Sequence, residues 1–146
     1  MVKWENIKFF KKYEFFCHHC NTEQMQQNFI DKLEAFRVWL NMPLIILSGY
    51  RCPVHNAEVK GAKYSAHLNG DAVDIKTPKG LTIFEFFKKV EQYGEFSRIG
   101  INAMSGFLHI DDETNEAIYP GKRWYYVGAG NETKPLTEEK RKEWEI

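Results

Sequence analysis

The chain has 146 residues, with 20 basic and 20 acidic side chains and a formal net charge of zero. This balance offers no general attraction for nucleic acid or an anionic membrane, so we expect neither as a partner. Apolar residues make up 43% of the chain and aromatic residues 15%, which excludes general disorder and indicates a soluble globular protein. We expect one monomeric domain over residues 1–128, followed by a charged C-terminal tail over 129–146.

The first residues, Met1 to Lys8, lack the apolar core and the small-residue cleavage site of a secretory signal. No stretch approaches the ~20 consecutive apolar residues that span a bilayer. We therefore expect no signal peptide and synthesis in the cytoplasm. A substrate outside the cytoplasm would have to be reached by a separate release route.

The first half of the chain predicts helix and strand in alternation. Aromatic residues over 9–16 predict a short strand or irregular layer that caps the core. A helix is expected over 23–40, because its apolar residues step by four, four, three and four along one face: Met25, Phe29, Leu33, Phe36 and Leu40. The apolar run 44–47 predicts a buried strand, and the polar connection 53–64 is expected to hold one helical turn at most.

The second half adds one helix and most of the sheet. Thr82 can cap a helix over 83–93 that ends at Gly94. Strands are predicted over 70–75, 98–101, 107–111 and 124–127, the last at an edge of the sheet. From Gly128 onward we find no core-forming pattern, although 138–145 could form a loose helix. The predicted fold class is α+β: a small, mostly antiparallel sheet with helices on one side.

Two segments, 65–74 and 106–111, have the strongest chemical signal. They offer His67, Asp74 seven residues later and a distant His109. Two imidazoles and one carboxylate leave a fourth position for water, as a catalytic zinc site requires, whereas a structural zinc site is closed by four protein ligands. The set therefore indicates metal-assisted hydrolysis. The alternative is a pair of ordinary histidines that hydrogen-bond within the core.

The three cysteines cannot all pair within one chain. Cys17 and Cys20 have the C-x-x-C spacing of a zinc knuckle or a redox pair, with His18 and His19 between them. A metal site made from these four residues alone is awkward, because adjacent side chains tend to point apart. Cys52 becomes a third ligand only if the fold brings it close. A structural zinc, a disulfide and ordinary buried thiols all remain open.

The motifs 48–51, 65–74 and 106–111, together with Asn56, resemble the zinc D-alanyl-D-alanine carboxypeptidase family. These peptidoglycan peptidases share their metal core with hedgehog signalling domains. The resemblance covers about residues 16–124, and its S-x-H-x-x-G-x-A-x-D element is its most specific part. It implies a hedgehog/DD-peptidase-like fold and a phage or bacterial enzyme that degrades the cell wall.

The same resemblance implies roles for individual residues. His67, Asp74 and His109 would bind Zn²⁺. Arg51 would face a carboxylate of the substrate, a task that suits a permanently charged planar group. Ser65 could hydrogen-bond the substrate or the groups that support the ligands.

The general base is the point at which this sequence departs from the resemblance. Many members of the family place a Glu or Asp three residues before the last histidine ligand, where this chain has Gly106. Asp111 shares a strand face with His109 and would act either as the base or as a residue that orients a ligand. The weaker candidates for the base are Asp112, Glu113 and His55.

The function that the resemblance implies is cleavage of the peptide stems of peptidoglycan. A D-Ala-D-Ala carboxypeptidase is our leading interpretation, and an endolysin that acts as an L-Ala-D-Glu or other endopeptidase is the nearest alternative. Gly106 favours a different class, a zinc-binding module that recognises the cell wall without cutting it. A structural or virion component without metal is a further alternative.

Overall fold

The computed structural model describes all residues, 1–146, and contains one six-stranded sheet. The strands are β1 (Ile46–Ser48), β2 (Ala72–Lys76), β3 (Arg98–Asn102), β4 (Phe107–Asp111), β5 (Arg123–Tyr126) and β6 (Thr133–Pro135). Their order across the sheet is β1-β2-β4-β3-β5-β6, and every pair is antiparallel except β3 with β5. The predicted α+β class with a mostly antiparallel sheet is confirmed.

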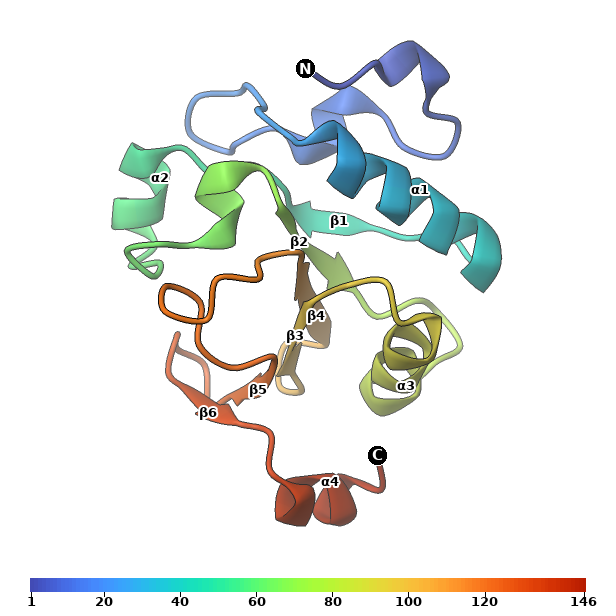
Figure 1. Ribbon diagram of the computed structural model, residues 1–146, viewed down its shortest axis with the longest axis vertical. Coiled ribbons are helices and arrows are strands. Elements are labelled where there is room, and N and C mark those ends of the chain that lie inside the picture. The colour runs from blue at the N-terminus through green and yellow to red at the C-terminus, as the bar shows by residue number, and fades with distance from the viewer.

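The helices lie on both sides of this sheet (Figure 1). They are α1 (Gln27–Leu40), α2 (Pro53–Glu58), α3 (Ile83–Tyr93) and α4 (Glu138–Trp144), with short 3₁₀ helices η1 (Trp4–Asn6), η2 (Lys12–Phe15) and η3 (Ala66–Asn69). The longer helices α1 and α3 share one side, whereas α2 and η3 lie on the other. The expected helical layer is formed by α1 and α3, and the short elements α2 and η3 add to the opposite side. No helix has the length and apolar character needed to cross a membrane.

The hydrophobic core lies between the sheet and the pair α1 and α3. Alternate residues of the central strands face these helices and are almost fully buried: Val73, Ile75, Ile99, Ile101, Leu108 and Ile110. Phenylalanines dominate the helical side of the core: Phe29, Phe36, Phe86 and Phe87. Because side chains alternate along a strand, the intervening residues of β2, β3 and β4 face the opposite side.

Local sequence signals predicted the bounds of α3 correctly but the start of α1 less well. Thr82 caps α3 and Gly94 ends it, as predicted, and Glu85 completes a reciprocal capping box with Thr82. Helix α1 begins at Gln27 rather than at residue 23, because the Gln26 amide donates to the carbonyl of Gly70 (3.0 Å) instead of starting a helix. The aromatic segment over 9–16 forms η2 and loops rather than a strand.

The C-terminal residues have more structure than their charge pattern indicates. They add β6 and α4, so that β5 is an interior strand and β6 takes the edge. Leu136, Trp144 and Ile146 pack against the core. Arg141 of α4 holds Glu91 of α3 through two hydrogen bonds of 2.9 and 2.8 Å. Residues after Gly128 thus pack against the core and include the helix expected there, although single apolar residues among charges leave no periodicity to detect in the sequence.

One close approach in the sheet shapes the face opposite the core. Gly100 pairs with Trp124 across the parallel strands β3 and β5. A Cβ atom on Gly100 would lie 2.5 Å from the indole ring of Trp124. The missing side chain lets this ring lie over the sheet, with its centroid 5.3 Å from that of His109.

The Gly100→Ala variant tests this packing. The new methyl group must push the indole away, so we expect a loss of roughly 1–3 kcal/mol in the free energy of unfolding, measured by urea denaturation. Gly130→Ala is the matched control, because nothing lies within 4 Å of its Cβ position and its backbone does not need glycine. Equal stabilities for the two variants would contradict the account.

Candidate metal centre

The floor of the site is the middle of the sheet. Asp74 of β2 and His109 of β4 are direct cross-strand partners in the antiparallel ladder. Both project from the face opposite the core, since their neighbours Val73 and Ile110 are fully buried on the core side. The register of two strands therefore brings together residues that are 35 positions apart.

His67 reaches the same place from η3. Its backbone amide donates to the hydroxyl of Ser65, which caps the turn, at 3.3 Å. Gly70 ends η3 with φ +72, and a Cβ atom there would lie 1.9 Å from the carbonyl oxygen of Gln24. A glycine is thus needed both for the left-handed backbone and for the close approach of the chain.

The three side chains converge on one point. Oδ1 of Asp74 lies 3.3 Å from Nε2 of His67 and 3.1 Å from Nδ1 of His109. One donor atom from each of the three residues lies within 4.8 Å of the others. His67 and His109 are 2% and 6% exposed. Two imidazoles and a carboxylate arranged in this way fit the donor set of a zinc site with an open position.

The outer nitrogen of each imidazole also has a partner. Nδ1 of His67 donates to the carbonyl of Gly49 at 2.7 Å, and Nε2 of His109 donates to Oδ2 of the fully buried Asp111 at 2.6 Å. These bonds direct Nε2 of His67 and Nδ1 of His109 towards Asp74. Such outer partners are what orient and polarise metal-binding histidines.

Electrostatics link the carboxylate and the imidazoles. Burial alone would raise the pKa of the Asp74 carboxyl, but His67 and His109 outweigh burial and hold that pKa well below its usual range. Burial lowers the pKa of His109, but the hydrogen bonds of its ring with Asp111 and Asp74 outweigh burial and raise this pKa to about 9. Without a metal, the pocket therefore favours a positive charge on the His109 ring between two carboxylates.

The sequence model of the family described as Peptidase M15 matches residues 8–111. The chain belongs to this family of peptidases. The match confirms the resemblance drawn from the sequence motifs, and the family is zinc-dependent. No curated protein matches the chain. The matched region ends with the last residue of β4, so β5, β6 and α4 lie beyond it.

A cleft of about 590 Å³ opens above His67, Asp74 and His109 in this M15 peptidase. The loop over 61–65 and η3 form one wall, and residues between 118 and 135 form the other. Asn131 of the second wall is tied to the residues just before the first, because its side-chain amide donates to the carbonyls of Val59 and Lys60. The basic residues that line the cleft outnumber its carboxylates. The carboxylates are Asp74 and Asp111, and the basic residues are Arg51, Lys63, Arg98, Arg123 and Lys134.

Arg51 and Ser65, the two residues expected to contact a substrate, both line this cleft. Nη1 of Arg51 donates to Oδ1 of Asn56 at 3.0 Å. Asn56 is held in turn by a hydrogen bond from its side-chain amide to the carbonyl of Ala62. The buried Nε of Arg51 has no partner. The hydroxyl of Ser65 accepts a bond from the His67 amide, so its observed contact is structural.

The candidates for the general base lie in different places. Gly106 lies in the turn before β4 and presents no side chain. Asp111 lines the cleft, but its two oxygens already accept from the His109 ring and from the amide of Glu113. The other candidates do not line the cleft: Asp112 pairs with Lys32, Glu113 with Asn69 and His55 with Glu58. The cleft therefore has no carboxylate without a structural partner.

Several residues of the site had no role assigned from the sequence, among them Asn56, which was named only as part of the resemblance. Asn56 holds the Arg51 guanidinium, and Arg98 lies 3.7 Å from Asp111 while its guanidinium carbon stacks 4.6 Å from the Trp124 ring centre. Trp124 and Tyr126 line the cleft. The signal for the last two was the alternation of β5, since residues two apart share a face of the strand.

The raised pKa of His109 predicts that zinc binding is coupled to proton release. Nδ1 must be free of its proton to bind a metal, so at neutral pH about one proton should leave His109 on binding. The apparent affinity should rise with pH up to about 9 and then level off. Calorimetry in two buffers of different ionisation enthalpy measures the released protons. A binding enthalpy that is the same in both buffers would contradict this coupling.

The Asp111→Asn variant separates the two roles considered for Asp111. If the carboxylate orients His109, the neutral amide should weaken zinc affinity about 10–100-fold, measured by competition with a chromogenic chelator. Asp112→Asn is the matched control, because Asp112 lies outside the cleft. Undiminished zinc affinity with lost turnover would instead assign Asp111 the role of base.

Proposed function

We propose that this M15 peptidase is a zinc enzyme that cleaves the peptide stems of peptidoglycan, with D-Ala-D-Ala carboxypeptidase activity as its leading reaction. Membership in the family supports a metallopeptidase. The observation that carries the finer proposal is the position of Arg51, whose buried Nε lacks a partner at the edge of a cleft that also holds two imidazoles and a carboxylate.

In this proposal Nε2 of His67, a carboxylate oxygen of Asp74 and Nδ1 of His109 hold the zinc ion. Zinc with three protein ligands supplies a Lewis acid that polarises a carbonyl group and acidifies a coordinated water. The carbonyl of Gly49 and the carboxylate of Asp111 keep the two imidazoles in position for the metal. We therefore assign Asp111 an orienting role rather than that of a base.

Arg51 would bind the terminal carboxylate of the stem peptide. A guanidinium bound to a carboxylate makes charge-assisted bonds in a planar geometry, and Asn56 already fixes the plane by accepting from Nη1. The excess of basic residues along the cleft favours an anionic substrate. A substrate held at its terminal carboxylate would present its last peptide bond to the metal.

Tyr126 is the proposed donor to the oxygen of the scissile carbonyl. Burial and the nearby Asp74 carboxylate raise the pKa of its phenol, so the hydroxyl keeps its proton at neutral pH. The residue lines the cleft beside the three proposed ligands. A fixed donor at this place can stabilise the negative charge that develops on the oxygen during hydrolysis.

One observation favours a second candidate function, a zinc-binding module that recognises peptidoglycan without cleaving it. Both carboxylates in the cleft already have structural partners, so no free acidic side chain is available to accept a proton. Under this alternative the same cleft and Arg51 would bind the stem peptide, and the metal would serve recognition alone.

Turnover of purified muropeptides decides between these functions. The zinc-loaded protein should release terminal D-alanine from stems that end in D-Ala-D-Ala, identified by mass spectrometry, and His67→Ala should abolish the release. New termini within the stem would show an endopeptidase instead. Binding of the muropeptide without any cleavage would establish the recognition module.

The Arg51→Lys variant tests how the substrate is held. We expect kcat/KM to fall about 10–100-fold for stems with a free terminal carboxylate, since one charged planar contact is lost. The exposed Lys89 of α3 lies outside the cleft, so Lys89→Ala is the control. An equal fall for stems with an amidated C-terminus would show that Arg51 does not bind the carboxylate.

A further inference from the structure

Three cysteines from two distant parts of the chain lie together, outside the cleft. Cys17 and Cys20 belong to the turn after η2, and Cys52 immediately precedes α2. We propose that Cys17, Cys20 and Cys52 form a second metal site, which binds a structural zinc ion and ties the N-terminal segment to the loop that holds Arg51. This site is separate from the centre formed by His67, Asp74 and His109.

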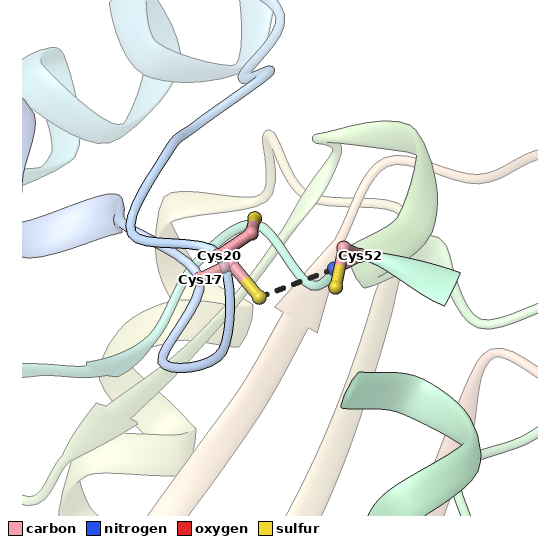
Figure 2. Close-up of side chains that lie close together, drawn as sticks. All are labelled: Cys17, Cys20 and Cys52. Carbon is pink, nitrogen blue, oxygen red and sulfur yellow. Dashed lines mark hydrogen bonds between the residues drawn. The ribbon is translucent and has the colours of Figure 1, made fainter. Parts of the chain in front are cut away.

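The positions of the sulfur atoms suit a single ion. All three Sγ atoms lie within 4.8 Å of one another. Zn–S bonds of about 2.3 Å in a tetrahedron place two sulfurs roughly 3.8 Å apart, so small side-chain rotations close the site. Figure 2 shows the three side chains side by side, with the backbone nitrogen of Cys52 joined to Sγ of Cys17. Cys20 is exposed, and its sulfur contacts the Thr22 hydroxyl at 3.1 Å, a weak bond that a metal ion can replace.

Backbone amides point at two of the three sulfur atoms, those of Cys17 and Cys52. The amide of Cys52 donates to Sγ of Cys17 at 3.3 Å, and the amide of His55 donates to Sγ of Cys52 at 3.4 Å. The thiolate is the form that binds metal, and amides directed at sulfur stabilise it before the ion arrives.

His19 is the candidate for the fourth ligand. Its Nδ1 lies 3.5 Å from Sγ of Cys52, close to the roughly 3.6 Å that separates sulfur and nitrogen ligands on tetrahedral zinc. The ring is exposed and can turn towards the other two sulfurs. His18 faces a different neighbour, the ring of His55, at 5.9 Å. Three cysteines and one histidine are a common closed set for structural zinc.

The second site would stabilise the loop over 49–52, which lies between the two metal centres. On one side the amide of Tyr50 donates to the carbonyl of Phe15 at 3.0 Å. On the other side Gly49 accepts from the ring of His67, and the amide of Arg51 donates to the carbonyl of His67 at 3.1 Å. An ion that joins Cys52 to Cys17 and Cys20 would thus limit the movement of both His67 and Arg51.

Cobalt substitution in the full-length protein tests the proposal. Thiolate ligands give Co²⁺ an intense charge-transfer absorption in the near ultraviolet, which imidazole and carboxylate ligands do not give. We expect this band in the wild type and, undiminished, in the control double variant His67→Ala/His109→Ala. The control keeps this test independent of the proposed peptidase activity.

The variant Cys20→Ser removes an exposed ligand and should leave the core intact. We expect it to lose most of the charge-transfer band and roughly one zinc equivalent per chain, and to unfold at a lower temperature than the wild type. A wild-type protein without the band, or an intact mass two hydrogens too low, would overturn the proposal, the latter by showing a disulfide.

Replacing His19 by Ala should alter the visible d–d absorption of cobalt and replacing His18 should not. Equal spectra for the two histidine variants would exclude His19 as the fourth ligand.

Discussion

The site of this M15 peptidase depends on the pairing of Asp74 with His109 across β2 and β4. A slip of either strand by one residue would turn its own member of the pair, Asp74 or His109, into the core and would put an apolar neighbour such as Val73 or Ile110 on the cleft side. The register is held by the apolar face of the same strands, which packs against α1 and α3. The hydrophobic core and the polar site are therefore two results of one alternation. A buried carboxylate between two imidazoles is stable only because the pairing is exact enough to keep it hydrogen-bonded.

Around this pair, each imidazole is fixed through its outer nitrogen to a different part of the fold. His67 is tied to the carbonyl of Gly49, and His109 to Asp111 of its own strand. Asp111 is fully buried and lies near Arg98, which in turn stacks on Trp124. These contacts leave little freedom to the rings, which favours a preorganised metal centre. They also occupy the carboxylate that the sequence offered as a base.

The loop over 49–52 connects the site to the N-terminal segment. Gly49 lies so close to Phe15 that a Cβ atom would be 2.7 Å from its Cα. Arg51 projects into the cleft, whereas Cys52 turns back towards Cys17 and Cys20. Any restraint on the cysteine cluster is thus transmitted to Arg51 and His67 over a few residues of backbone. This arrangement gives the N-terminal aromatic layer a part in positioning the cleft as well as in covering the core.

The sequence alone determined the elements whose signals are local. The capping box and terminal glycine of α3, the alternation of β2 and β4, and the motif containing His67 and Asp74 could all be read from residues close together in the chain. Only the tertiary structure decided what depends on distances between elements. Asn56 meets Arg51, Asp111 bonds the outer nitrogen of His109, three cysteines converge, and the C-terminal residues dock as β6 and α4. Periodicity reports which face of its own element a side chain occupies, but the partner that it meets there is set by packing between segments far apart in sequence.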